Sequence, residues 1–441
     1  MIVPRTKLIA WTSLIVLPFT ALAASWPPAV AVAALLIGGL AALAIFDAGL
    51  ARARIAGLRV DLPELVRLQK DRPGVMEVRL HNEAKAAREL KLGFGFPPEI
   101  EVREDVRTVA VPAETEDSRV EWNCTARERG RFAIERAFIE VESPLGFWGW
   151  RASLPVRAEV RVYPNLLAER RNVAAIFLRR TMTGAHAQRS AGQGREFEKL
   201  REYVAGDSLG DVHWKAAAKR GHLVTKVHQV ERSHEVYVIV DASRLSSRPV
   251  NATETALERF VTAAMILGVA AEQQGDQFGL ITFSDRVLSF VRARGGAAHF
   301  AACRDRLYTL QPQSVTPDFE ELCSFLKLRL RKRALLIFLT ALDDPFLAES
   351  FVTSSELLAR QHLILVNTLR SPGAHALFDN AGVASVDDLY RNLGGHLQWQ
   401  RLRELEKVLR RRGIRFAALD PVQIAADLVR QHAEVRAREL V

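Results

Sequence analysis

The first fifty residues contain two apolar stretches without a single charged side chain. Residues 8–24 and 29–46 contain no Asp, Glu, Lys or Arg. At 1.5 Å per residue, a helix of either length nearly crosses a hydrocarbon core of ~30 Å. Only Ser-Trp-Pro-Pro at residues 25–28 lies between them. Residues 1–54 are therefore expected to form an N-terminal transmembrane helical hairpin.

Basic residues flank this hairpin at both ends. Arg5 and Lys7 precede the first stretch, and Arg52 and Arg54 follow the second. Because positive charge stays on the cytoplasmic side, the rest of the chain is expected to face the cytoplasm from a cell inner membrane. A cleaved signal peptide is the competing interpretation of the first stretch, but no small-residue cleavage site follows it and a second stretch begins at once.

Residues 55–165 show short runs in which apolar and polar residues alternate. Alternation places one side of a strand on a core and the other side in water, so successive runs predict a β-sandwich-like domain. The runs cover residues 75–82, 89–96, 107–112, 118–124, 131–142 and 158–164.

Residues 234–441 show apolar runs of strand length separated by segments of helical period. This order predicts an α/β doubly wound, mostly parallel sheet, and a turn at residues 284–286 adds one antiparallel edge strand. The strand-like runs are 235–240, 278–283, 287–291, 334–339, 362–368 and 414–418, and the helix-like segments are 252–274, 319–330, 347–360 and 400–412.

The intervening residues, 166–233, divide into a connector with little periodicity and a dense block of charged and aromatic residues at 192–231. Within the block, residues 197–204 place polar and apolar side chains at helical spacing, which predicts a helix.

Composition limits the classes of function. With 441 residues, 49% hydrophobic and 25% charged, the chain has the composition of a globular protein with two or more soluble domains. The net charge of +10 is spread along the chain, without the basic tract that nucleic-acid binding needs, and suits an anionic membrane surface. Three cysteines without a Cys-x-x-Cys spacing indicate buried thiols in a reducing compartment.

The most informative strand-like run ends in Asp241-Ala-Ser243. A parallel sheet holds such a carboxylate and hydroxyl at its carboxyl edge, where both can act as oxygen ligands of a divalent cation. The alternative is that Asp241 caps the next helix or bonds the loop backbone.

The block before this run carries a recognisable signature. Its marker residues are Glu196, Arg201, Tyr203, Gly206, Asp207, Trp214 and Lys215. They resemble the signature of a bacterial family known as domain-of-unknown-function family fifty-eight, although His213, Ala217 and Lys219 depart from it. The resemblance implies a membrane hairpin, a β-rich segment and a von Willebrand factor A-like domain, often encoded beside a MoxR-type AAA+ ATPase.

The resemblance also implies a metal-ion-dependent adhesion site. Asp241 and Ser243 match its first two ligands, and Thr316 can supply the loop hydroxyl. Leu245 and Ala341 occupy the positions of two further oxygen ligands. The site is therefore degenerate, and Mg²⁺ is expected to bind weakly, because it demands near-octahedral oxygen coordination.

These observations favour a non-enzymatic, membrane-anchored module that binds a protein partner, with a MoxR-type ATPase as the implied partner in assembling or maturing protein complexes. The candidate contact residues are Asp241, Ser243, Thr316, Asp343, Asp207, Trp214 and Lys215.

Two other functions remain open. Residues 206–210 match the Gly-x-Ser-x-Gly pattern of a hydrolase centred on Ser208 or Asp207, although such an elbow needs a strand before it and a helix after it. The chain can also be a purely structural scaffold on the inner membrane.

Overall fold

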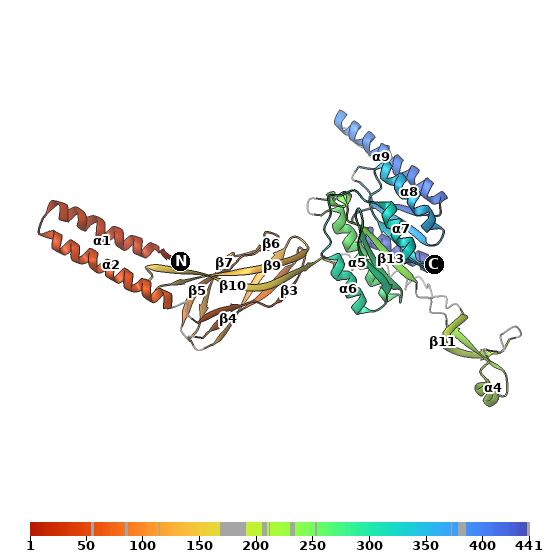
Figure 1. Ribbon diagram of the computed structural model, residues 1–441, viewed down its shortest axis with the longest axis horizontal. Helices are drawn as coiled ribbons and strands as arrows, with labels where there is room; N and C mark the ends of the chain where they lie inside the picture. The colour runs from red at the N-terminus through yellow and green to blue at the C-terminus, as the bar shows by residue number, and fades with distance from the viewer. Residues whose placement is uncertain are drawn as a thin grey trace. The chain divides into compact units, whose positions relative to one another are not determined.

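The computed structural model describes residues 1–53, 57–83, 87–113, 115–167, 191–204, 210, 212–229, 234–251, 254–371, 373–377 and 385–438. The chain divides into two compact units, Met1–Asn165 and Leu166–Val441 (Figure 1).

Two apolar helices open the first unit. Helix α1 is Thr6–Ser25 and helix α2 is Ala29–Ala53, and they lie side by side (Figure 1). Both are long and apolar enough to cross a membrane. The predicted pair of apolar helices is therefore confirmed.

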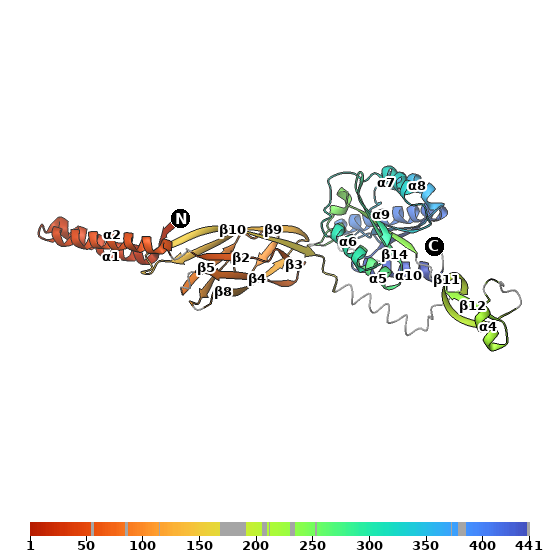
Figure 2. The same cartoon turned by 60° about the horizontal axis from the view of Figure 1, so that its bottom comes forward.

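The remainder of the first unit consists of two packed sheets (Figure 2). One has the order β1-β10-β9-β5-β7, with β3 beside β10, and the other has the order β2-β4-β8-β6. The strands are β1 (Ile2–Pro4), β2 (Leu58–Asp61), β3 (Leu65–Gln69), β4 (Pro73–Asn82), β5 (Arg88–Phe94), β6 (Ile100–Val102), β7 (Val106–Val111), β8 (Asp117–Ala126), β9 (Gly130–Glu142) and β10 (Trp148–Tyr163).

Alternation in the sequence builds the core of this sandwich. In β4, Met76, Val78 and Leu80 are buried while the residues between them are exposed. They belong to one apolar cluster with Leu92 of β5 and Ile139 of β9. The predicted sandwich is thus observed, and each sheet presents one apolar face to the other.

A buried carboxylate joins the helical hairpin to the sandwich. Asp47, near the end of α2, is fully buried. Its Oδ1 accepts the N–H of Leu145 at 3.0 Å and its Oδ2 accepts the N–H of Phe147 at 3.3 Å, both in the turn between β9 and β10. The indole Nε1 of Trp148 donates to the carbonyl oxygen of Ala44 at 2.7 Å. These bonds satisfy turn N–H groups that no strand can pair.

The second unit contains a six-stranded sheet of order β15-β14-β13-β16-β17-β18. All neighbours are parallel except β15, which runs antiparallel to β14. The strands are β13 (Glu235–Asp241), β14 (Gln277–Phe283), β15 (Val287–Arg294), β16 (Leu335–Leu339), β17 (Leu363–Leu369) and β18 (Arg415–Leu419). The predicted doubly wound sheet with one antiparallel edge strand is observed.

Helices cover both faces of this sheet (Figure 1). Its central strands read as continuous apolar runs because both faces are buried. Helices α7 (Phe319–Arg329), α8 (Pro345–Ala359) and α9 (Val386–Arg411) pack with one face, and α5 (Ala256–Gln273), α6 (Ala297–Leu307) and α10 (Ile424–Ala437) with the other.

The expected helix at residues 197–204 is wrong. Residues 191–202 form strand β11 (Ala191–Glu202), which pairs antiparallel with β12 (Val224–Gln229). The partner strand lies more than twenty residues downstream, so the ladder overrides the local helical spacing. Helix α9 also begins at Val386, well before the expected residue 400.

The Asp47 junction makes a first prediction. Replacing Asp47 by Ala should leave the buried N–H of Phe147 and the part-buried N–H of Leu145 without their acceptor, and the buried group alone costs about 1–3 kcal/mol. We expect the melting temperature of the detergent-solubilised full chain, followed by tryptophan fluorescence, to fall by several degrees. The same substitution at the exposed Asp105 is the control. Equal melting temperatures for the two variants would contradict a role for this junction in stability.

Candidate functional site

The strand order reverses between β13 and β16, whose carboxyl ends lie side by side. In open α/β sheets, ligands bind outside the carboxyl ends of the strands at the point of reversal, because the loops diverge there to opposite faces. Asp241 ends β13, and Thr340 directly follows β16. The carboxyl ends of β13 and β16 are therefore the first candidates for a functional site.

Asp241 is fully buried and links the end of β13 to the end of β16. Its Oδ1 accepts the N–H of Ser243 at 2.8 Å, and its Oδ2 accepts the hydroxyl of Thr340 at 2.6 Å. Burial raises the pKa of Asp241, and these hydrogen bonds oppose the rise. Asp241 thus bonds the loop backbone at Ser243, which is the alternative to a metal ligand that the sequence left open. Thr340 was missed in the sequence because its partner is 99 residues away.

The Thr316 loop lies against the loop that follows β13. Arg244 N–H donates to the Val315 carbonyl oxygen at 2.9 Å, and Gln313 N–H donates to that of Ala242 at 2.7 Å. Thr316 is exposed, whereas the neighbouring Leu245 is buried. The structure thus brings the Thr316 loop beside the Asp241 loop, as the sequence suggested, but it does not place the Thr316 hydroxyl in the buried cluster.

An ion pair crosses the same edge of the sheet. Arg248 Nη1 lies 2.7 Å from Asp343 Oδ2, with the arginine side chain 49% exposed and the aspartate 12%. Burial raises the pKa of Asp343, and the Arg248 charge opposes this. Arg248 was not a candidate in the sequence, since no local pattern ties it to a carboxylate 95 residues away.

This set of donors does not fit a Mg²⁺ ion. Both oxygens of Asp241 are engaged by protein donors, and Oδ2 of Asp343 is paired with an arginine. Leu245 and Ala341 bring no side-chain oxygen. Among the described residues, no group of three or more His, Cys, Asp or Glu side chains is arranged to hold a metal ion. The positive charge beside the Asp343 carboxylate comes from the guanidinium of Arg248.

The signature block contributes a separate surface. Trp214 begins helix α4 (Trp214–Arg220), and its side chain is 64% exposed, with Lys215 exposed beside it. The Nδ1 of His213 accepts the N–H of Ala216 at 3.1 Å and so caps this helix. Asp207 lies outside the described residues.

The described neighbours of Ser208 do not form a nucleophile elbow. Ser208 itself lies outside the described residues. The strand before it, β11, belongs to a two-stranded antiparallel hairpin and ends at Glu202. After it, Val212 pairs with Thr225, and a helix begins only at Trp214. A nucleophile elbow requires a tight turn that joins a strand to a helix around the serine. The described residues on either side of Ser208 do not have this arrangement, and they do not support the hydrolase hypothesis.

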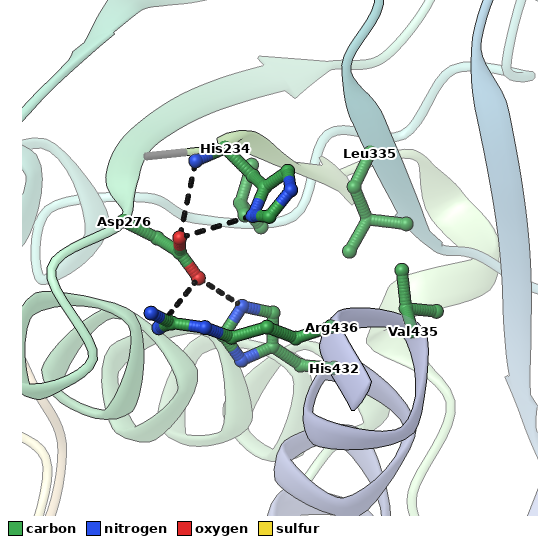
Figure 3. A pocket seen from close by; sticks show the side chains of 7 residues that line it. His234, Asp276, Leu335, His432, Val435 and Arg436 are labelled. Atoms are coloured by element: carbon green, nitrogen blue, oxygen red, sulfur yellow. Dashed lines mark hydrogen bonds and ion pairs between the residues drawn. The ribbon is translucent and has the colours of Figure 1, made fainter. Parts of the chain in front are cut away.

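A second polar cluster lies at the amino ends of the strands (Figure 3). The fully buried Asp276 carboxylate accepts the His234 N–H at 3.1 Å and lies 2.9 Å from His432 Nε2 and 3.5 Å from Arg436 Nη1. Burial raises the pKa of Asp276, but the hydrogen bonds from His234 and His432 outweigh it and hold the pKa well below its usual range. The cluster fastens helix α10 to the starts of β13 and β14.

Asp276→Asn tests this cluster. At pH 7 we expect the substitution to lower the free energy of unfolding by about 3 kcal/mol, since it breaks a buried charge network. Because the folded-state pKa lies below the unfolded value of about 3.9, wild-type stabilisation is complete above that value and is lost progressively as pH falls from it toward the folded-state pKa. The difference in melting temperature between the two full-length proteins should therefore begin to narrow only below about pH 4, and it should be smaller at pH 3 than at pH 5. Parallel curves would contradict an ionised Asp276.

Comparisons with known proteins give one family match and several similar structures. No match was found among curated protein sequences. Crystal structures of the conserved hypothetical protein BatB from Bacteroides thetaiotaomicron (13% identity, TM-score 0.31) and of an aerotolerance-related membrane protein from Bacteroides fragilis NCTC 9343 (13%, 0.32) each match 46% of this chain and 99% of their own. Proximal thread matrix protein 1 from the mussel byssus, with a zinc-occupied MIDAS motif, matches 45% of this chain and 46% of its own (15%, 0.27). Residues 199–393 match the family described as "Protein of unknown function DUF58", and the family resemblance seen in the sequence is thereby confirmed.

Proposed function

We propose that this chain is a membrane-anchored, non-enzymatic module of von Willebrand factor A-like type that binds a protein partner at the carboxyl edge of its parallel sheet. Its parts are a transmembrane hairpin (1–54), a β-sandwich-like domain (55–165), a connector with the signature block (166–233) and a von Willebrand factor A-like domain (234–441).

The observation that carries this proposal is the Asp241–Thr340 hydrogen bond at the point where the strand order reverses. It fixes the ends of β13 and β16, so that the loops beyond them are held in one arrangement. We call the residues at this carboxyl edge of the sheet the rim; they are Asp241, Ser243, Arg248, Thr316 and Asp343. A preorganised rim favours binding, because less conformational entropy is lost when a partner docks.

The exposed members of the rim are the groups that a partner can reach. Arg248 and Thr316 are exposed, and Asp343 lies beneath Arg248. Asp241 and Ser243 are fully buried, so in this proposal they hold the loops while Arg248 and Thr316 make the contacts. An arginine offers several N–H donors and a permanent charge, which suits an acidic group on the partner without a bridging metal.

Trp214 and Lys215 are proposed as a second contact surface. A tryptophan that is 64% exposed at the start of a helix is unusual for a side chain of its size. Exposed tryptophans are frequent anchors of protein interfaces. Asp207 of the same block belongs to this proposed surface by sequence position alone.

A MoxR-type AAA+ ATPase is the partner that the family resemblance suggests, with assembly or maturation of protein complexes as the joint task. An anchored binding module and a soluble ATPase form a reasonable pair, because anchoring confines the ATPase to the membrane where its substrates lie. Neither the rim nor Trp214 requires the chain itself to catalyse a reaction.

Charge reversal on the rim tests this proposal. Arg248→Glu should weaken capture of a purified MoxR-type ATPase from the same genome by the detergent-solubilised chain at least tenfold, since it places two carboxylates together on the rim. The matched control is Arg294→Glu, on an exposed arginine at the opposite edge of the sheet. Unchanged capture by Arg248→Glu would place the interface elsewhere, and a further Trp214→Ala variant then tests the second surface.

The proposed orientation, with the soluble domains facing the cytoplasm from the inner membrane, rests on the basic residues that flank the hairpin. A fluorescent reporter fused after Val441 should therefore fluoresce in cells, while an alkaline phosphatase fused at the same point should be inactive. An active phosphatase fusion would overturn this orientation.

A further inference from the structure

The amino edge of the parallel sheet carries a concentration of positive charge. Strands β16, β17 and β18 are parallel neighbours, so the segments that lead into them reach the same edge. These segments, residues 327–333, 356–362 and 406–415, contain eleven Lys or Arg residues, all exposed, and two Glu residues. Their formal net charge of +9 compares with +10 for the whole chain, because basic and acidic residues nearly balance elsewhere. We call the surface of these three segments the basic face.

Contacts join the three segments into one surface. The side-chain Nε2 of Gln361 donates to the Arg331 carbonyl oxygen at 3.3 Å, which ties the loop before β17 to the loop before β16. Arg412 Nη1 lies 3.6 Å from Glu356 Oε2, which ties the end of α9 to the end of α8. Cations that are far apart in the sequence are thereby held close together.

The positive charge of the basic face exceeds what the fold itself uses. Cations in the last turn of a helix interact favourably with its carboxyl end, which accounts for those in the last turns of α7 and α9. Both glutamates of the face are already paired with arginines of the same face. Arg331 and Lys332 lie beyond α7, and neither forms an ion pair with a described residue. The repulsion among so many like charges would be relieved by an anionic surface.

Two large apolar side chains stand among these cations. Leu328 of α7 is 78% exposed and Leu357 of α8 is 55% exposed. The three segments contain no Phe, Tyr or Trp, whereas proteins that hold single-stranded nucleic acid stack bases on aromatic side chains. Cations with leucines between them suit a phospholipid surface, because the cations meet phosphate groups and the leucines enter the boundary of the acyl region.

We propose that the basic face docks on the anionic phospholipid surface of the membrane that holds the helical hairpin. The hairpin and the parallel sheet belong to one chain, so the hairpin keeps the basic face near that surface and a modest affinity is sufficient. Each cation that reaches an anionic bilayer strengthens binding about fivefold. Docking through the amino edge leaves the carboxyl edge, with Arg248, turned away from the bilayer. The inference does not rest on the identity of a protein partner at that edge.

Fluorescence quenching of the full chain in lipid nanodiscs tests this docking. A dye on Leu328→Cys should be quenched by nitroxide-labelled lipid at least twofold more when a third of the lipid is phosphatidylglycerol than when all of it is phosphatidylcholine. The native Cys124, Cys303 and Cys323 are buried, so the dye selects the introduced thiol. The increase should vanish in 1 M salt, which shortens the range of electrostatic attraction to about 3 Å.

A second labelling position controls for proximity to the bilayer. Phe346 is 83% exposed at the start of α8, at the carboxyl edge of the sheet. A dye on Phe346→Cys should show the same quenching in both kinds of nanodisc. An increase of equal size at positions 328 and 346 would overturn the proposal, since it would show no preference for the amino edge.

Charge reversal tests the basic face itself. Arg331→Glu combined with Lys332→Glu should abolish the extra quenching at position 328 in phosphatidylglycerol without lowering the melting temperature, because both side chains are exposed. Arg244→Glu combined with Arg286→Glu is the matched control, since it changes the net charge equally at exposed positions of the carboxyl edge. Equal quenching in both kinds of nanodisc, or equal loss in both double variants, would overturn the proposal. Binding of a DNA duplex without any response to phosphatidylglycerol would also overturn it and would assign the face to nucleic acid.

Discussion

A carboxylate taken out of water must find donors, and in this chain that requirement fixes the junctions between elements. The requirement applies to three carboxylates whose side chains are buried: Asp47, Asp241 and Asp276. Each accepts a hydrogen bond from a group far away in the sequence. The donor lies in the turn between β9 and β10 for Asp47, directly after β16 for Asp241, and in helix α10 for Asp276. Removing a donor would leave a buried charge unpaired, at a cost larger than most single contacts provide.

The sequence predicted the elements that follow a simple period. The central strands of the α/β sheet were found within one or two residues, because a strand buried on both faces reads as an uninterrupted apolar run. The apolar hairpin was equally clear. Helix α9 was found only in its second half, since the first half has no buried face to impose a pattern. Strand β11 was misread because its pairing with β12 is not a local property.

The candidate site was predictable only in part, for the same physical reason. The position of Asp241 at the end of a strand could be read directly from the pattern. Its partner Thr340 and the Arg248–Asp343 pair could not, because they depend on which strands become neighbours in the sheet. In the sequence these residues resemble an incomplete metal site. In the structure, Ser243 and Thr340 donate hydrogen bonds to Asp241, and Arg248 pairs with Asp343, so protein groups neutralise the carboxylates that a cation would otherwise neutralise.

The short strand β1 has a consequence for biogenesis. Ile2–Pro4 pairs with β10, where Ile2 lies opposite Trp150. During translation, at about 5–20 residues per second, its partner emerges about 7–30 s later. The two apolar helices leave the ribosome in between, while Ile2–Pro4 is still unpaired. The pairing of β1 with β10 can therefore form only after both apolar helices have been synthesised.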